Sequence, residues 1–139
     1  MEQAAGGPDG RTAGFVDRFD CFWSNPDPDT AAELVAADAV ANWPGVEPIR
    51  GSEHPEHIAR ILALIPDLRL EVIEHAEAGE LVFISWRARG TVGGEPLEWT
   101  GIDRFRVRDG RAVDALVAYD IQPLQEAVQR SQAAGAAAS

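Results

Sequence analysis

The segment WTGIDRFRV, residues 99–107, alternates between two kinds of side chain, and this alternation decides the fold. A period of two is typical of a β-strand, because successive side chains of a strand point to opposite faces of the sheet. One face of this strand carries Trp99, Gly101, Asp103, Phe105 and Val107. The other face carries Thr100, Ile102, Arg104 and Arg106. The pattern predicts a strand with one buried face in an antiparallel sheet.

Further strands are predicted on both sides of this segment. The strand before it has an inner face made of Val82, Ile84, Trp86, Ala88 and Val92, and the strand after it has one made of Val113, Ala115, Val117 and Tyr119. The dipeptides Gly93-Gly94 and Asp109-Gly110 separate these strands and are strong signals for hairpin turns. A further strand is predicted where Leu68, Leu70 and Val72 alternate with polar residues.

The residues before Pro66 have helical rather than alternating periodicity. A first helix is predicted from Phe15, Phe19, Phe22 and Trp23, ending near residues 24–26. Thr30 and Glu33 have the spacing of a capping box, which predicts a short second helix through Leu34 and Val35, followed by an extended segment over residues 39–43. A third helix is predicted from Gly51-Ser52 to Pro66, with a buried stripe of Ile58, Ile61, Leu62 and Ile65. Helices followed by antiparallel strands indicate the α+β class, with a curved sheet that has helices packed on one side.

Composition indicates a single soluble domain. The chain has 139 residues, and we place the domain at residues 11–128, between a flexible N-terminus (1–10) and a low-complexity, mobile tail (129–139). The net charge of -11 argues against nucleic acid and against an anionic membrane surface as partners. No apolar stretch is long enough to span a bilayer, no signal peptide is visible, and Cys21 is the single cysteine, so a cytoplasmic protein is expected.

Asp103 breaks the pattern of its strand, because its carboxyl group falls on the apolar face. Burial of a carboxyl group costs free energy unless the group is paired, protonated or in a cavity. Burial also raises its pKa, so that it stays partly neutral and can donate a hydrogen bond or a proton. The alternative is a structural role, in which Asp103 bonds a backbone group at a strand bend or the indole N–H of a tryptophan.

The order of elements resembles the nuclear transport factor 2-like fold, and within it the SnoaL-like polyketide cyclases and ketosteroid isomerases. The resemblance covers about residues 12–124 and is carried by five segments, namely AADAV at 36–40, IRG at 49–51, WTGIDRFRV at 99–107, DGR at 109–111 and AYD at 118–120. It implies a cone-shaped curved antiparallel sheet with three N-terminal helices packed on its concave face. It also implies a cofactor-independent reaction on a small hydrophobic molecule, and a homodimer formed through the convex face of the sheet, where Arg87, Arg89, Arg104 and Arg106 would pair with carboxylates such as Glu71 or Asp114.

Carried over residue by residue, the resemblance implies an incomplete catalytic site. Asp103 stands where ketosteroid isomerases have the protonated acid, but Phe19 replaces their tyrosine and Trp43 replaces their proton-abstracting aspartate. Val117 stands where SnoaL-like cyclases have an acid. Asp120 is close to it, but parity puts Asp120 on the opposite face, and its role stays open.

Other side chains are candidates for a pocket. Trp43, Trp86 and Trp99 either fill core volume or line an apolar pocket, with Asn42 and Tyr119 as polar contacts. His54 and His57 have a spacing that can supply two metal ligands, but a solvated first helical turn explains them equally well, and no metal is expected. His54 alone can also reach the cavity mouth as an acid or base, although an exposed position is the simpler expectation.

The sequence therefore predicts a SnoaL-like cyclase or isomerase. Asp103 would be its general acid, and an apolar, polyketide- or terpenoid-like substrate would contact Trp43, Trp86, Trp99, Asn42, Tyr119, Phe19, Val117 and His54. The alternative is a non-catalytic module of the same fold that binds hydrophobic ligands. A protein-transport adaptor is a third possibility that rests on the fold alone.

Overall fold

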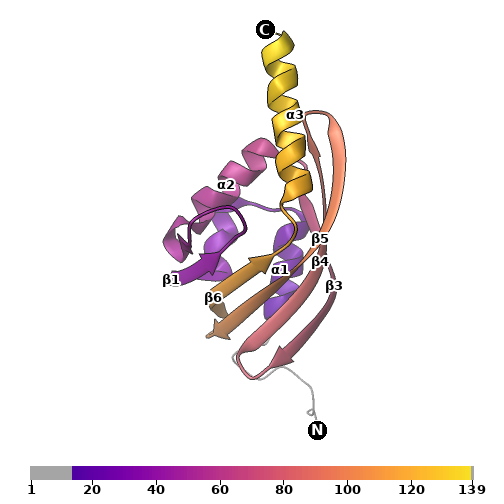
Figure 1. Ribbon diagram of the computed structural model, residues 1–139. Helices are drawn as coiled ribbons and strands as arrows, with labels where there is room; N and C mark the ends of the chain where they lie inside the picture. The colour runs from indigo at the N-terminus through magenta and orange to yellow at the C-terminus, as the bar shows by residue number, and fades with distance from the viewer. Residues whose placement is uncertain (1–13, 139) are drawn as a thin grey trace.

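The computed structural model describes residues 14–138, which form a curved six-stranded sheet with helices on its concave side (Figure 1). The helical elements are α1 (Phe15–Ser24), η1 (Pro28–Glu33), η2 (Gly51–Glu53), α2 (His54–Leu64) and α3 (Gln122–Ala138). The strands are β1 (Val35–Asn42), β2 (Ile49–Arg50), β3 (Arg69–Ala78), β4 (Leu81–Val92), β5 (Glu95–Arg108) and β6 (Arg111–Ala118). The predicted N-terminal segment 1–10 lies outside the described residues. None of the helices in the described part of the chain has the length and apolar character needed to span a membrane.

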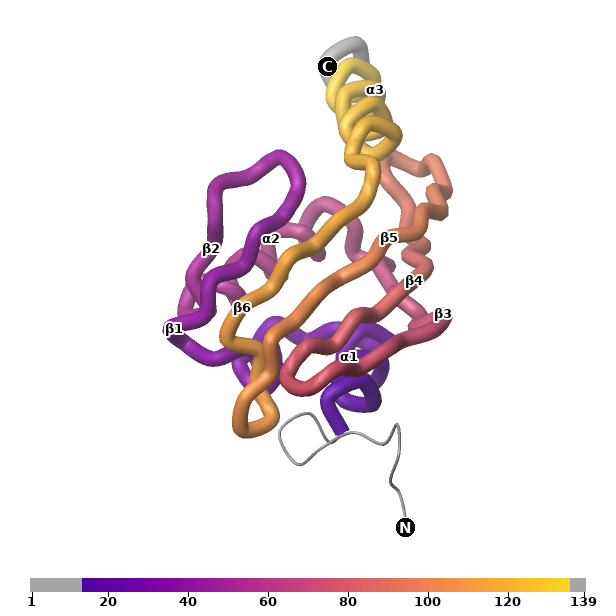
Figure 2. The backbone as a smooth tube through the Cα atoms, turned by 60° about the horizontal axis from the view of Figure 1, so that its bottom comes forward, coloured from indigo at the N-terminus to yellow at the C-terminus, as the bar shows by residue number. Residues whose placement is uncertain are grey.

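The strands are arranged in the order β2-β1-β6-β5-β4-β3, which Figure 2 shows across the face of the sheet. Neighbours from β6 to β3 are antiparallel, as the hairpin signals predicted, but β1 and β6 run parallel, so the sheet is mixed rather than purely antiparallel. Gly93 and Gly94 have φ of 58° and 84°, and Asp109 and Gly110 have φ of 51° and 80°. Two consecutive positive φ values are what a tight two-residue hairpin requires, so both predicted turns are confirmed.

The core lies between the concave face of the sheet and the helices. Phe15 and Phe19 of α1 pack edge-on against Phe105 of β5, with ring centroids 5.0 and 5.7 Å apart. Ile58 of α2 is fully buried. The aromatic face predicted for the first helix therefore holds that helix on the middle strand.

Two local predictions were wrong. The second helix is a 3₁₀ helix that starts at Pro28, and Asp27 caps it by accepting a hydrogen bond from the backbone N–H of Asp29 at 3.0 Å, so Thr30 and Glu33 do not form a capping box. Val35 opens β1 instead of ending that helix. In β6, the register shifts opposite Arg106 and Val107, so the fully buried residue is Ala112 and Val113 is only half-buried.

The C-terminal segment differs from the expected tail, because α3 continues from Gln122 through the assigned boundary at residue 128 to Ala138. The carboxylate of Asp120 accepts a hydrogen bond from the backbone N–H of Gln122 at 3.0 Å. Arg130 donates to both carboxylate oxygens of Glu95, at 3.1 and 2.8 Å, and so ties α3 to the start of β5. Leu124, Ala127 and Val128 pack against the core. The first part of α3, from Leu124 to Arg130, therefore packs on the sheet.

The arginines of the outer sheet face pair with carboxylates within the chain. Arg87 donates to Glu71 at 3.2 Å and Arg104 donates to Asp114 at 3.0 Å, which are the two acids named from the sequence. These pairs follow from the strand register and leave the expected homodimer untested.

Candidate functional site

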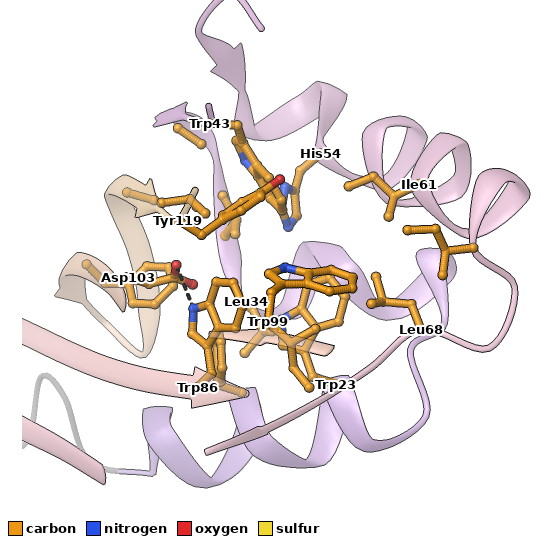
Figure 3. Close-up of a pocket in the computed structure, with 18 of the residues that line it drawn as sticks. Trp23, Leu34, Trp43, His54, Ile61, Leu68, Trp86, Trp99, Asp103 and Tyr119 are labelled. Carbon is orange, nitrogen blue, oxygen red and sulfur yellow. Dashed lines mark hydrogen bonds between the residues drawn. The ribbon is translucent and has the colours of Figure 1, made fainter. Parts of the chain in front are cut away.

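An apolar cavity of about 120 Å³ lies between the concave face of the sheet and helices α1 and α2 (Figure 3). Most of its walls are aliphatic and aromatic side chains, and the residues with titratable side chains on it are Asp103, His54 and Tyr119. A cavity of about 150 Å³ accommodates one benzene molecule, so this space is close to the size of one small ring. Of the residues that line it, Leu64 is exposed, and several others are half-buried, among them Trp43, Ile61, Trp99, Tyr119 and Leu124.

Asp103 is the acid of this pocket. Strand β5 places it between Ile84 of β4 and Val117 of β6, and only 5% of its surface is exposed. The indole Nε1–H of Trp86 donates to Asp103 Oδ1 at 2.9 Å, and no other side-chain hydrogen bond to Asp103 is formed within the described chain. Burial raises the pKa of Asp103 from 3.8 to about 7, against the opposing effect of the Trp86 hydrogen bond, which favours the carboxylate. Asp103 is therefore a carboxyl group that gains or loses its proton near neutral pH.

The position of the Trp86 indole depends on Gly101. The two residues face each other across β4 and β5, and a Cβ atom on Gly101 would overlap the indole ring and lie 2.8 Å from the carbonyl oxygen of Ala118. The indole also packs edge-on against Tyr119, with ring centroids 5.7 Å apart. Burial raises the pKa of the Tyr119 hydroxyl, and the neighbouring Asp103 carboxylate raises it further. Gly101 thus gives Trp86 the space it needs to reach Asp103.

His54, the first residue of α2, lies on the wall opposite the sheet. Both His54 and His57 are buried, so the expectation of a solvated first helical turn was wrong. Burial, and to a smaller extent the nearby His57, lower the pKa of His54 to about 4. The rings of both histidines pack against Trp43, with centroids 6.3 and 4.6 Å from that indole.

Eight of the nine residues chosen from the sequence line this pocket, and Asn42 does not. Asn42 is exposed, because it follows the buried Ala41 and its side chain points to the outer face of β1. Asp120 is exposed and serves as the hydrogen-bond acceptor at the start of α3. The eight lining residues are Phe19, Trp43, His54, Trp86, Trp99, Asp103, Val117 and Tyr119.

Sequence reasoning missed two kinds of pocket residue. Trp23 lines the cavity, and the aromatic stripe of the first helix was the signal that could have identified it. Leu124 lines the cavity from α3. Because no helix was predicted there, the sequence analysis did not consider its side chains as pocket residues. Within residues 14–138, no three His, Cys, Asp or Glu side chains lie close enough together to hold a metal ion.

Comparison with known proteins identifies the class and the family. The architecture is that of the nuclear transport factor 2-like, or ketosteroid isomerase-like, fold. The model of the SnoaL-like domain matches residues 16–115, and the chain belongs to this family. No match was found among curated proteins.

Solved structures with this fold include proteins of several kinds. The wild-type protein IdmH from Streptomyces antibioticus, a candidate polyketide cyclase, is 25% identical and has a TM-score of 0.72 over 84% of this chain and 97% of that one. An epoxide hydrolase from M. tuberculosis is 20% identical, with a TM-score of 0.68 over 90% of this chain and 94% of that one. A hypothetical protein from Catenulispora acidiphila, in complex with trimethylamine, is 21% identical, with a TM-score of 0.72 over 79% of this chain and 88% of that one. The last two likenesses concern the fold alone.

Proposed function

We propose that this protein is a cofactor-independent cyclase or isomerase whose substrate is a small, apolar, polyketide- or terpenoid-like molecule that carries a carbonyl group. One observation supports this proposal above all others, namely a buried carboxyl group, Asp103, on the wall of an apolar pocket. The match to the SnoaL-like domain and the likeness to a candidate polyketide cyclase support the same class of reaction.

Asp103 acts as the proton donor in the proposed mechanism. Below about pH 7 it is protonated, so it donates a hydrogen bond from its hydroxyl to the carbonyl oxygen of the substrate. When an enol carbon of the same substrate bonds to the carbonyl carbon, the π electrons of the C=O bond move to its oxygen, which takes the proton from Asp103. Asp103 is then a carboxylate until it takes up the proton that the enol hydroxyl of the attacking group loses. The Trp86 N–H then stabilises the new carboxylate, because its hydrogen bond favours the ionised form.

The aromatic walls supply orientation and exclude water. Trp43, Trp86 and Trp99 surround the space next to Asp103 (Figure 3). When the pocket holds a flexible substrate with its reacting atoms in contact, the entropic part of the activation free energy is lowered. The cavity is the size of one ring, so a longer substrate extends past Leu64 and Leu124 towards solvent.

The test is the effect of Asp103→Asn on turnover and on binding. Turnover of polyketide and terpenoid ketones is followed by mass spectrometry, and binding by tryptophan fluorescence. We expect turnover to fall by about a hundredfold, the lower part of the range for general acid catalysis, while binding changes by less than about fivefold. Asp38→Asn, an exposed acid on β1, is the matched control. Unchanged turnover in Asp103→Asn would show that Asp103 is not the acid.

The second candidate function is a non-catalytic module that binds the same class of ligand. Trp43 and Val117 favour it, because both line the pocket at positions where the resemblance places acids in catalytic relatives. Tight binding of these ketones with no product from any of them would support the binding module and contradict the enzyme.

A further inference from the structure

His54 occupies a place in the pocket that the proposed acid chemistry does not use. It is 8% exposed, belongs to helix α2 and lines the cavity. In Figure 3 its ring points from the helix into the pocket, beside Trp43, while Asp103 lies on the sheet next to Trp86. The cavity therefore has a polar group on each of two walls.

The start of α2 is fixed by two local features. The carboxylate of Glu53 accepts a hydrogen bond from the backbone N–H of Arg50 at 2.9 Å. Gly51 packs so closely on β1 that a Cβ atom there would overlap the carbonyl oxygen of Ala36. These contacts hold the start of the helix against the sheet, so the backbone at His54 is fixed at the wall of the cavity.

The imidazole of His54 is neutral in the folded protein. Burial lowers its pKa to about 4, and so does the adjacent His57, whose own pKa is lowered by burial and by Arg60. Within the described chain, no carboxylate lies within ion-pair distance of either ring. A neutral imidazole has one nitrogen that donates a hydrogen bond and one that accepts.

The polar atoms around His54 are poorly satisfied. Its Nδ1 atom is buried and has no hydrogen-bond partner among residues 14–138, and the same is true of Trp43 Nε1 and of His57 Nε2. Of the two histidines, His54 is the one that lines the cavity. Buried polar atoms are nearly always hydrogen-bonded, because burial without a partner costs free energy. Burial of the unpaired His54 imidazole in an apolar wall therefore costs free energy that no side chain in the described part of the chain offsets. A ligand in the cavity can supply the missing hydrogen-bond partner.

We infer that His54 is a specificity-determining residue of the pocket, which selects ligands that carry a hydroxyl group in addition to the carbonyl group received by Asp103. This inference rests on the proposed function and deepens it, since it names the second polar group of the ligand. A phenolic or enolic hydroxyl suits this contact because it both donates and accepts, and so it matches either tautomer of the ring. The substrate class is then a hydroxy-ketone whose two oxygens stand at different ends of an apolar body.

Two probes of one ring test the inference. Acetophenone carries the carbonyl group alone, and 4-hydroxyacetophenone adds a hydroxyl at the opposite end of the ring. Dissociation constants are measured by tryptophan fluorescence and by calorimetry for the wild type, for His54→Phe and for His57→Phe. The last variant is the matched control, because His57 packs against the same indole but does not line the cavity.

We expect the wild type to bind 4-hydroxyacetophenone about tenfold more tightly than acetophenone, since a hydrogen bond contributes about that factor. The preference disappears in His54→Phe and persists in His57→Phe. A preference that survives in His54→Phe, or equal binding of the two probes by the wild type, would overturn the inference and leave the proposed function intact. Failure of the wild type to bind either probe would overturn both.

A measurement on the wild type does not depend on whether His54→Phe folds. The ¹⁵N chemical shifts of the imidazole nitrogens report hydrogen bonding directly. Addition of 4-hydroxyacetophenone shifts the His54 signals and acetophenone does not, while the exposed His75 is unaffected by both. Equal shifts of His54 with the two probes would contradict the inference.

Discussion

The carboxyl group of Asp103 makes the stability of the protein depend on pH in a direction opposite to that of most acids. Its pKa is raised in the folded protein from 3.8 to about 7. In the unfolded chain the group ionises above about pH 4, whereas in the folded chain it stays neutral up to about pH 7. Its contribution to stability is therefore fully present below pH 3.8 and is lost as the pH rises through about 7.

The size of this effect follows from the pKa values. Each pH unit between the unfolded and folded values corresponds to about 1.4 kcal/mol, so the rise from 3.8 to about 7 removes about 4 kcal/mol between these limits. A domain is typically stable by about 5–15 kcal/mol, so the change is large. His54 acts in the opposite direction, because its pKa is lowered from 6.5 to about 4 and its contribution, about 3 kcal/mol, is lost as the pH falls through that interval.

Asp103→Asn separates the two effects, since the amide cannot ionise and its oxygen still accepts from Trp86. Urea unfolding followed by tryptophan fluorescence gives the free energy of unfolding of both proteins between pH 4 and pH 8.5. The free energy of unfolding of the variant minus that of the wild type should increase by about 4 kcal/mol between pH 4 and pH 8.5. The contribution of His54 is the same in both proteins and cancels in this difference. Asp38→Asn serves as the exposed control. A difference between wild type and Asp103→Asn that does not vary with pH would refute a buried, neutral Asp103.

Three further predictions concern other parts of the molecule. Trp86→Phe removes the hydrogen bond that favours the carboxylate, so the pKa of Asp103 should rise above about 7 in a ¹³C NMR titration, and an unchanged value would contradict the role given to the indole. Gly101→Ala should cost about 1–3 kcal/mol in urea unfolding, because its methyl group meets Trp86 and the Ala118 carbonyl, whereas Gly135→Ala in α3, where a Cβ atom has open space, should not destabilise. We also propose a homodimer through the convex sheet face, where four adjacent strands expose Val40, Phe83, Ile102 and Leu116. Light scattering should show a monomer for Ile102→Arg and a dimer for the control Val46→Arg. A monomeric wild type at micromolar concentration would contradict the dimer.

The parts of the fold that were predicted from the sequence are those encoded locally. Strand alternation placed Asp103 on the inner face, and Gly93-Gly94 and Asp109-Gly110 predicted their turns because positive φ values need such residues. The parallel pairing of β1 with β6 was not predicted, because it joins segments about seventy-five residues apart and leaves no local pattern. Helix α3 was missed because its alanine-rich end was interpreted as a low-complexity tail, although alanine has the highest helix propensity.

The site was predicted to a similar extent. The alternation of side chains along the strands identified Asp103, Trp86 and Tyr119 as pocket residues, because side chains on the inner face of one sheet point into the same cavity. The same reasoning failed for Asn42, which lies one residue out of phase with the buried Ala41. Burial of His57 could not be predicted from its own helix, because it depends on contact with Trp43, which follows another element.

The protonation states of the pocket have a consequence for which form of a molecule enters it. Between about pH 4 and pH 7, Asp103 keeps its proton while His54 and His57 lack theirs, so these three groups present no ionic charge inside a chain of net charge -11. A carboxylate or phosphate ligand meets a repulsive potential outside and no counter-ion within. The pocket therefore discriminates between ligands by their ionisation state as well as by their shape. A weak acid would enter it only in its neutral, protonated form.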